Sequence, residues 1–239
     1  MSRHTLDHWI RDRARTTPDR TAIDYGDAIT TYAELDARSD ELARDLRHGE
    51  VVSTLTGNSP EHVALFFACA KAGAILHPIS WRLAPAEIAY QLDDAGSSRF
   101  VVEDAYRELG DAAVALADGR NRPPGSGPGL TPGDDDGLLL IYTSGTTGKP
   151  KGALLTHANC FWTNLSFDLA TGIGGDDVVL ACLPQFHCGG WNVQPLLGWW
   201  KGATVVVERT FDAGRALELI EGKRVTTMMG VPANYLFMA

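Results

Sequence analysis

The chain has 239 residues, of which 44% are hydrophobic and 21% are charged, as in an ordinary globular protein. Its formal net charge of −9 argues against a nucleic-acid-binding or anionic-membrane surface, because both need clustered basic residues. No apolar run is long enough to span a bilayer, and the N-terminus lacks the apolar core of a secretory signal. The four cysteines have no metal-site spacing and lie in apolar surroundings, so we expect reduced, mostly buried thiols in a cytoplasmic protein.

The first half of the chain alternates helical patterns with short apolar runs. A capping box begins one helix at Thr31, a second helix runs from its cap Ser59 to Gly73, and a third closes at Gly96. The predicted strands between them are 51–55, 74–79 and 99–102. Residues 1–117 are therefore predicted to form a first α/β segment.

The alternation breaks and then resumes. Residues 118–136 are rich in Pro, Gly, Ser and Asp, which predicts a linker or surface loop. Residues 137–239 are predicted to form a second α/β segment, with helices capped by Thr156 and Asp212. Its predicted strands are 138–142, 153–157, 178–183, 203–208 and 225–231. The whole pattern predicts an α/β fold of layered, mostly parallel sheets flanked by helices.

One stretch, YTSGTTGKPKG at 142–152, has nothing apolar after Tyr142 and follows a continuous apolar strand. Ligands of open α/β sheets bind at the carboxyl ends of strands, and glycines let backbone N–H groups approach an anion there. Hydroxyl groups add donors, and lysines add positive charge. The predicted phosphate-binding residues are Thr143, Ser144, Gly145, Thr146, Thr147, Gly148, Lys149 and Lys151.

Two common phosphate-binding motifs do not fit this stretch. A Walker loop needs four residues between its glycines and a hydroxyl residue after its lysine. Here Gly145 and Gly148 are too close, and Pro150 follows Lys149. A kinase or GTPase of the Walker type is therefore disfavoured, and the dinucleotide-binding pattern G-x-G-x-x-G is also absent from the sequence.

All eleven residues of the stretch closely resemble the phosphate-binding signature of the adenylate-forming enzymes, which include acyl-CoA synthetases, peptide-synthetase adenylation domains and luciferases. LPQFHCGG at 183–190 and VTTMMGVPANYLFMA at 225–239 resemble two further segments of that family. The resemblance covers nearly the whole chain. We interpret the chain as the N-terminal portion of an acyl-CoA synthetase of the fatty-acid CoA ligase type. The fold expected from this resemblance is an incomplete large domain without the C-terminal lid.

The resemblance implies a two-step reaction with ATP, Mg²⁺ and coenzyme A. A carboxylate attacks the α-phosphorus of ATP to give an acyl-adenylate, and a thiol then displaces AMP to give a thioester. Both substrates of the first step are anions, so cations and N–H donors must stabilise charge at the reacting centre. The resemblance implies His187 and Lys151 as catalytic residues and Thr146 as the residue that contacts the metal.

The matching histidine of the family lies beside the carboxylate and the α-phosphate. A neutral imidazole suits this role because it can donate a hydrogen bond and still pack against an acyl group. The alternative for His187 is a satisfied core histidine, which we expect for His62 and His77. A Cys188–His187 nucleophile pair is disfavoured, because adjacent residues in a strand point to opposite faces.

The acyl pocket implied by the resemblance has two walls. Gly189 and Gly190 leave space beside the histidine, and Trp191 is either a gate over the acyl chain or an ordinary core aromatic. The second wall is predicted at Gly230, Val231 and Pro232. An aliphatic or fatty acid is the preferred substrate, and an aryl acid is the alternative. An amino acid is disfavoured, because GGWNVQ offers no Asp for its amine.

The sequence ends before the family's Y-G-x-T-E segment, its T-G-D segment and its lid lysine. We therefore expect this chain alone to be inactive. Three hypotheses stand: the N-terminal part of a synthetase, half of a split enzyme, or a non-catalytic nucleotide-binding module. The expected partners are a small carboxylate, ATP and coenzyme A, with either a homodimer or a complementing C-terminal chain and no nucleic acid.

Overall fold

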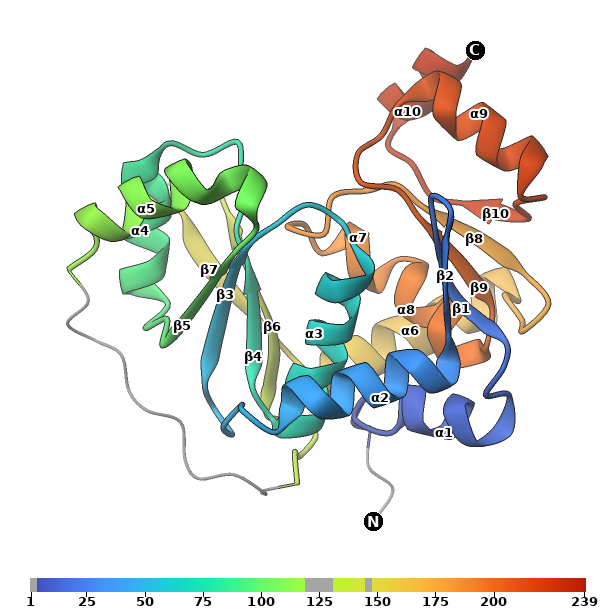
Figure 1. Ribbon diagram of the computed structural model, residues 1–239, viewed down its shortest axis with the longest axis horizontal. Helices are drawn as coiled ribbons and strands as arrows, with labels where there is room; N and C mark the ends of the chain where they lie inside the picture. Colours follow the sequence, from blue (N-terminus) through green and yellow to red (C-terminus); the bar gives the residue numbers. More distant parts are fainter. Residues whose placement is uncertain (1–3, 119–130, 145–147) are drawn as a thin grey trace.

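The computed structural model describes residues 4–118, 131–144 and 148–239 (Figure 1). Its strands are β1 (Thr21–Tyr25), β2 (Ala28–Thr31), β3 (Val51–Leu55), β4 (Ile75–Pro78), β5 (Arg99–Val102), β6 (Gly137–Thr143), β7 (Lys151–Thr156), β8 (Val178–Ala181), β9 (Thr204–Val207) and β10 (Thr227–Met228). Its helices are α1 (Trp9–Thr16), α2 (Tyr32–Ala43), α3 (Pro60–Ala72), α4 (Pro85–Asp94), α5 (Arg107–Leu116), α6 (His157–Thr171), α7 (Gly189–Asn192), α8 (Pro195–Lys201), α9 (Ala213–Gly222) and α10 (Pro232–Met238), with the 3-10 helix η1 (Asp104–Tyr106). None of these described helices has the length and apolar character that a membrane crossing requires.

The described strands form two five-stranded sheets that follow the same plan. The first sheet has the order β10-β8-β9-β1-β2, in which β2 is antiparallel to β1 and the other neighbours are parallel. The second sheet has the order β5-β3-β4-β6-β7, in which β7 is antiparallel to β6 and the other neighbours are parallel. The predicted class of layered, mostly parallel sheets is therefore confirmed.

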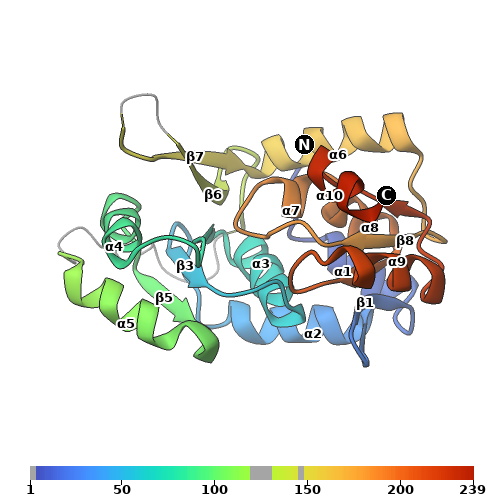
Figure 2. The same ribbon diagram turned by 90° about the horizontal axis from the view of Figure 1, so that it is seen from above.

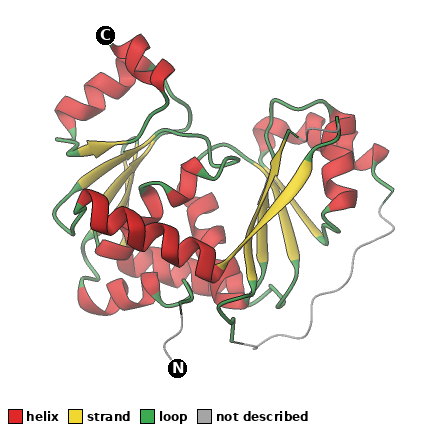
Figure 3. Cartoon of the chain, turned by 180° about the vertical axis from the view of Figure 1, so that it is seen from behind, coloured by secondary structure: helices red, strands yellow, loops and turns green. Residues whose placement is uncertain are grey.

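The two sheets share a central layer of helices. Apolar residues of both sheets pack with α2, α3, α6 and α8 in one continuous core (Figures 1 and 2). A second cluster around Leu55 and Ile88 joins the other face of the second sheet to α4 and α5, and a third around Leu180 and Leu219 joins the first sheet to α9. Figure 3 shows the resulting alternation of helices and sheets from behind.

The predicted helix starts are confirmed by their caps. The side-chain oxygens of Thr31, Ser59 and Thr156 each accept a backbone N–H of the first helical turn at 3.2 Å, and Asp212 does so at 2.8 Å. These bonds satisfy donors that a helix N-terminus otherwise leaves unpaired. At the other end of α3, Gly73 has φ 68°, a left-handed conformation that glycine adopts without steric cost.

The segments predicted at 1–117 and 137–239 do not correspond to the two sheets. β1 from the first segment pairs with β9 from the second, and β4 from the first pairs with β6 from the second. The chain therefore crosses between the sheets on both sides of the predicted linker at 118–136, most of which lies outside the described residues. Parallel pairing needs long crossover connections, so neighbours in a sheet come from distant sequence.

One local prediction differs from the structure, and one element was not predicted. The strand predicted at 225–231 is only the two residues of β10, because Pro232 begins α10 and has no N–H for a ladder. The hairpin of β1 and β2 was not predicted, although Gly26 has φ 64° in the tight turn between them. A Gly-Asp pair between apolar runs is the sequence signal for such a turn.

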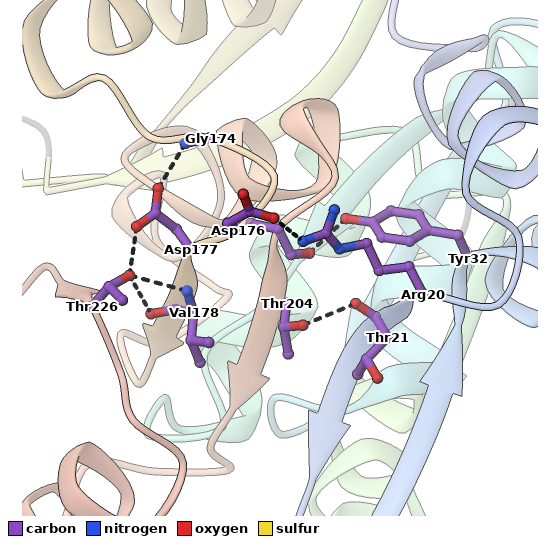
Figure 4. A network of polar contacts seen from close by, with 10 residues as sticks. Arg20, Thr21, Tyr32, Gly174, Asp176, Asp177, Val178, Thr204 and Thr226 are labelled. Carbon is purple, nitrogen blue, oxygen red and sulfur yellow. Dashed lines mark hydrogen bonds and ion pairs between the residues drawn. The ribbon is translucent and has the colours of Figure 1, made fainter.

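Polar contacts tie distant parts of the chain together at the amino end of the first sheet (Figure 4). Nη2 of Arg20 lies 2.6 Å from Oδ1 of Asp176, and Oγ1 of Thr204 donates to the carbonyl oxygen of Thr21 at 3.2 Å. These contacts join the start of β1 to the starts of β8 and β9. They leave the opposite, carboxyl end of the sheet for ligands.

Candidate functional site

A cavity of about 590 Å³, here the large cavity, lies where the carboxyl ends of parallel strands from both sheets meet. It is lined by residues that follow four different strands. Asn58 follows β3, Arg82 follows β4, Cys182 follows β8 and Arg209 follows β9. This is the end at which open α/β sheets bind ligands, so the cavity is the leading candidate for a binding site.

A second cavity of about 270 Å³, here the small cavity, lies at the end of β6. Thr143 and Ser144, the first residues of the predicted phosphate loop, line it. Phe186 and His187 line both the small and the large cavity. His187 therefore borders the place predicted for phosphate on one side and the larger space on the other.

His187 lies in a tight turn between β8 and α7, here the His187 turn (residues 183–190). Its backbone N–H donates to the carbonyl oxygen of Pro184 at 3.1 Å, and its carbonyl oxygen accepts the N–H of Gly190 at 3.0 Å. The ring packs edge-on against Phe186, with 4.8 Å between ring centroids. Partial burial lowers the pKa of His187, and the guanidinium of Arg82 lowers it further, so the neutral imidazole is favoured.

The structure describes only part of the predicted phosphate loop. Gly145, Thr146 and Thr147 lie outside the described residues. Gly148 has φ 89°, which places this glycine in the left-handed region that other residues disfavour. Lys151 begins β7, where it pairs with Thr143 across the antiparallel ladder, and its side chain is exposed.

α4 contacts the far end of this loop through one tyrosine. The hydroxyl of Tyr90 donates to the carbonyl oxygen of Pro150 at 3.2 Å, and Nζ of Lys149 lies 5.6 Å from the centroid of the same ring. The described residues hold no cluster of three His, Cys, Asp or Glu side chains that could bind a metal ion. The predicted metal contact, Thr146, is one of the residues outside the described ranges.

In one wall of the large cavity, the cations Arg82 and Arg209 pack on aromatic rings. Arg82 lies over Trp81 at 5.0 Å, and Trp81 stacks on Tyr106 with 5.8 Å between centroids. Arg209 lies over the same tyrosine at 5.8 Å and is paired with Glu103 at 2.7 Å. Cations over ring faces are attracted by the ring quadrupole, so this wall offers both flat apolar surface and positive charge.

Three of the residues predicted to form the acyl pocket line the large cavity: Gly189, Gly190 and Val231. Gly230 and Pro232 flank Val231 in sequence, but among the described residues they do not line the large cavity. The two adjacent glycines of the turn are not equivalent. A Cβ on Gly190 would lie 2.3 Å from the carbonyl oxygen of Pro184, whereas one on Gly189 would meet only side chains, at 3.5 Å or more. Gly190 therefore permits the turn itself to form.

Trp191 is a core residue in this structure and does not line the described cavities. Its side chain is 0% exposed and stacks on Phe66, with 4.7 Å between centroids. Its Nε1 donates to the carbonyl oxygen of Gln185 at 2.6 Å. The structure therefore places Trp191 in the core.

The prediction of mostly buried thiols is confirmed: Cys69, Cys160 and Cys182 are buried, and Cys188 is exposed. Cys188 and His187 lie in a turn and not in a strand, so the predicted reason for keeping their side chains apart does not apply.

The histidines expected to be structural, His62 and His77, are buried. Nδ1 of His77 lies 2.8 Å from the hydroxyl of Ser53, and Nδ1 of His62 lies 3.0 Å from Oε1 of Gln185. Burial lowers the pKa of each histidine to about 4, because a charged imidazole is disfavoured away from water. Both are therefore neutral near pH 7.

Sequence reasoning missed several residues of the site. Asn58, Trp81, Arg82 and Arg209 were not selected, although each follows the carboxyl end of a predicted strand. The rule that placed the phosphate loop at a strand end applies equally to them. These residues form no contiguous motif, so their position after a strand is the signal that could have identified them.

Comparison with known proteins gives relatives over the whole chain. The chain is 36% identical over 253 residues to a feruloyl-CoA synthase of Amycolatopsis, an alignment that covers 100% of this chain and 51% of the relative. It is 37% identical to an indoleacetate–CoA ligase of Aromatoleum aromaticum, over 98% of this chain and 51% of the relative. The chain thus spans about half the length of the curated relatives it matches.

Solved structures agree with this comparison. The N-terminal domain of FACL13 from Mycobacterium tuberculosis matches with a TM-score of 0.90 and 30% identity, covering 100% of this chain and 65% of that one. ATP-bound MatB from Rhodopseudomonas palustris matches with a TM-score of 0.84 and 27% identity, covering 99% and 51%. The family model described as AMP-binding enzyme matches residues 10–239. The chain belongs to the family of AMP-binding enzymes.

Proposed function

We propose that the protein takes part in ATP-dependent activation of a carboxylic acid to an acyl-adenylate, followed by transfer of the acyl group to the thiol of coenzyme A. One observation carries this proposal: His187 borders both the small cavity, which begins at the phosphate loop, and the large cavity. The family supports it, as do relatives whose names describe CoA ligases.

On the phosphate side, the described residues supply two kinds of group that this reaction needs. The exposed hydroxyl residues Thr143 and Ser144 offer donors to phosphate oxygens at the end of β6. Lys149 and Lys151 add positive charge, which offsets the repulsion between two anionic substrates. Mg²⁺, with Thr146 as its predicted contact, would add further neutralisation of the phosphates.

His187 provides a donor between the two substrates. A neutral imidazole carries one N–H that can bind a carboxylate oxygen, and the lowered pKa favours this neutral form at pH 7. Arg82, which lines the same cavity, adds a positive charge that attracts the carboxylate of the acid. In this scheme His187 orients the carboxylate toward the phosphate side.

We further propose an aromatic carboxylic acid as the substrate, in place of the fatty acid that the sequence favoured. Trp81, Phe186 and Phe211 line the large cavity and offer flat surfaces for ring stacking. The names of the relatives point the same way, since they act on feruloyl, indoleacetate and 2-succinylbenzoate groups. A fatty acid remains the competing substrate and belongs in every assay.

ATP–pyrophosphate exchange tests the proposal. The chain, with Mg²⁺, is incubated with ferulate, indoleacetate, benzoate, acetate and palmitate in separate reactions. Because the chain alone is expected to be inactive, the same reactions are run with a longer protein that contains it, and there we expect exchange to be fastest with an aryl acid. Exchange with palmitate alone would contradict the aromatic assignment. A folded, longer protein without exchange for any acid would contradict the activity.

A further inference from the structure

The His187 turn is fastened to the core by a side chain from the other sheet. Asn58, 4% exposed, lies between β3 and α3. Its Nδ2 donates to the carbonyl oxygens of Leu183 at 2.9 Å and Glu208 at 3.0 Å. Its Oδ1 accepts the N–H of Gln185 at 2.9 Å. Both donors and the acceptor of one amide are thus used to join the second sheet to segments that follow β8 and β9.

A second set of buried contacts holds Gln185, which is 2% exposed. Its Oε1 is 3.0 Å from Nδ1 of His62, and Nε2 of His62 is 3.1 Å from the hydroxyl of Thr54. An amide oxygen can only accept, so Nδ1 of this neutral histidine donates and Nε2 accepts the Thr54 hydroxyl. Nε1 of Trp191 donates to the backbone carbonyl of Gln185 at 2.6 Å. The backbone N–H, backbone carbonyl and side chain of Gln185 are all occupied.

These contacts form one connected, buried network around Gln185, which lies two residues before His187 in the chain. Its members, here the anchor network, are Thr54, Asn58, His62, Gln185 and Trp191. A buried polar group that loses its partner costs far more than an exposed one, so such a network strongly favours one arrangement. The ring of His62 also meets Trp191 edge-on, with 5.2 Å between centroids, which closes the network on itself.

We propose that Asn58 and Gln185 are positioning residues, which hold the His187 turn so that the imidazole of His187 stays between the large and small cavities. Neither side chain needs to contact a substrate for this role. Asn58 fixes the start of the turn against the end of β9, and Gln185 fixes its middle against α3. The catalytic consequence rests on the proposed function of His187, but the positioning itself can be measured without any substrate.

Hydrogen exchange of this chain tests the positioning directly. In Asn58→Ala, the backbone amides of Gln185 and His187 should exchange at least about tenfold faster, because the turn loses its two hydrogen bonds to Asn58, and the third bond of this amide, to Glu208, is lost as well. The matched control is Ser97→Ala, which removes the hydroxyl of another buried residue, bonded to Ser53 at 2.7 Å. The comparison is made at equal free energy of unfolding, adjusted with urea. Equal protection of the turn in both variants would overturn the proposal.

A gentler pair of variants covers the case in which Asn58→Ala does not fold. Gln185→Met keeps the side-chain size but removes the acceptor for His62, whereas Gln185→Glu keeps an acceptor at that place. We expect the imidazole resonances of His187 to shift or broaden in Gln185→Met and to stay near their original positions in Gln185→Glu. Unchanged His187 resonances in both variants would overturn the role of Gln185.

Kinetics separate this inference from the proposed function. In a protein that shows ATP–pyrophosphate exchange, Asn58→Ala or Gln185→Met should raise the KM for the acid about tenfold. The KM for ATP should stay within about twofold of its original value. Faster hydrogen exchange of the turn with unchanged enzyme kinetics would overturn the positioning role. If the turn loses its protection from hydrogen exchange but the unsubstituted protein shows no ATP–pyrophosphate exchange, the result supports positioning and contradicts only the proposed function.

Discussion

The two sides of the candidate site are built differently. On the acid side, the His187 turn is bonded to the buried side chains of Asn58, His62 and Trp191 and is backed by the stacked rings of Phe66 and Trp191. On the phosphate side, Thr143, Ser144 and Lys149 are exposed, and the described contacts of the loop's far end are those made by Tyr90. One side is fixed by the core, and the other presents its groups to solvent.

Because of this difference, we expect stability and function to be coupled on the acid side and separate on the phosphate side. Buried polar networks are costly to break, so changes in the acid side should alter the free energy of unfolding together with activity. Exposed side chains contribute little to stability, so changes on the phosphate side should alter nucleotide binding alone. Each prediction below tests one part of this contrast.

The largest effect is expected from His187→Ala, which removes the donor shared by the two sides. Loss of a preorganised donor to a developing charge lowers kcat by roughly 100-fold or more. ATP–pyrophosphate exchange measures it, with Cys188→Ser as the control, because Cys188 is the exposed neighbour of His187. A variant that retains more than half of the exchange rate would remove His187 from the reaction.

The next effect concerns the two glycines of the turn. Gly190→Ala should destabilise the fold by about 2 kcal/mol, because its Cβ would press on the backbone of Pro184. Gly189→Ala should cost less than about 0.5 kcal/mol, since its Cβ would make ordinary contacts. Urea unfolding of both variants measures the difference. Equal costs would mean that the turn is not confined as described.

A change on the phosphate side should leave stability alone. Lys149→Met removes an exposed charge, so the free energy of unfolding should change by less than about 0.5 kcal/mol. The KM for ATP should rise about fivefold, through the loss of one charge near the phosphates. Denaturation and exchange kinetics on the same preparation test both parts. A large loss of stability would contradict the contrast between the two sides.

The smallest effect is a shift of pKa. Arg82 contributes to the lowered pKa of His187, after partial burial of the ring. Removing its positive charge in Arg82→Met favours the protonated imidazole, so the pKa of His187 should rise. The acid limb of the pH–activity profile should move to higher pH by the same amount. Arg82→Lys keeps the charge and should leave the acid limb of the pH–activity profile unchanged. NMR titration of His187 measures its pKa in both variants.

Motifs and caps made much of this molecule predictable from sequence. The capped helices at Thr31, Ser59, Thr156 and Asp212 are present because their signals are local and depend on a few neighbouring residues. His187 and the first phosphate-loop residues were found because they belong to contiguous motifs. The family assignment followed from the same strings.

The remaining features depend on pairing between distant residues. The exchange of strands between the two chain halves sets which residues line the large cavity, and no local pattern encodes it. The burial of Trp191 likewise depends on Phe66 and Gln185, which come from other parts of the chain. The anchor network could not be predicted for the same reason, since Asn58 meets Gln185 across 127 residues.

The most direct test of the account is a structure of the protein with a non-hydrolysable aryl-sulfamoyl adenosine, an analogue of the acyl-adenylate. The account predicts the aryl group in the large cavity against Trp81 and Phe186, with the sulfamate linkage within hydrogen-bond reach of His187. The phosphate-mimicking side should face Thr143 and Ser144. An aryl group bound elsewhere, or a linkage out of reach of His187, would contradict the central claim that this histidine joins the two cavities in one reaction site.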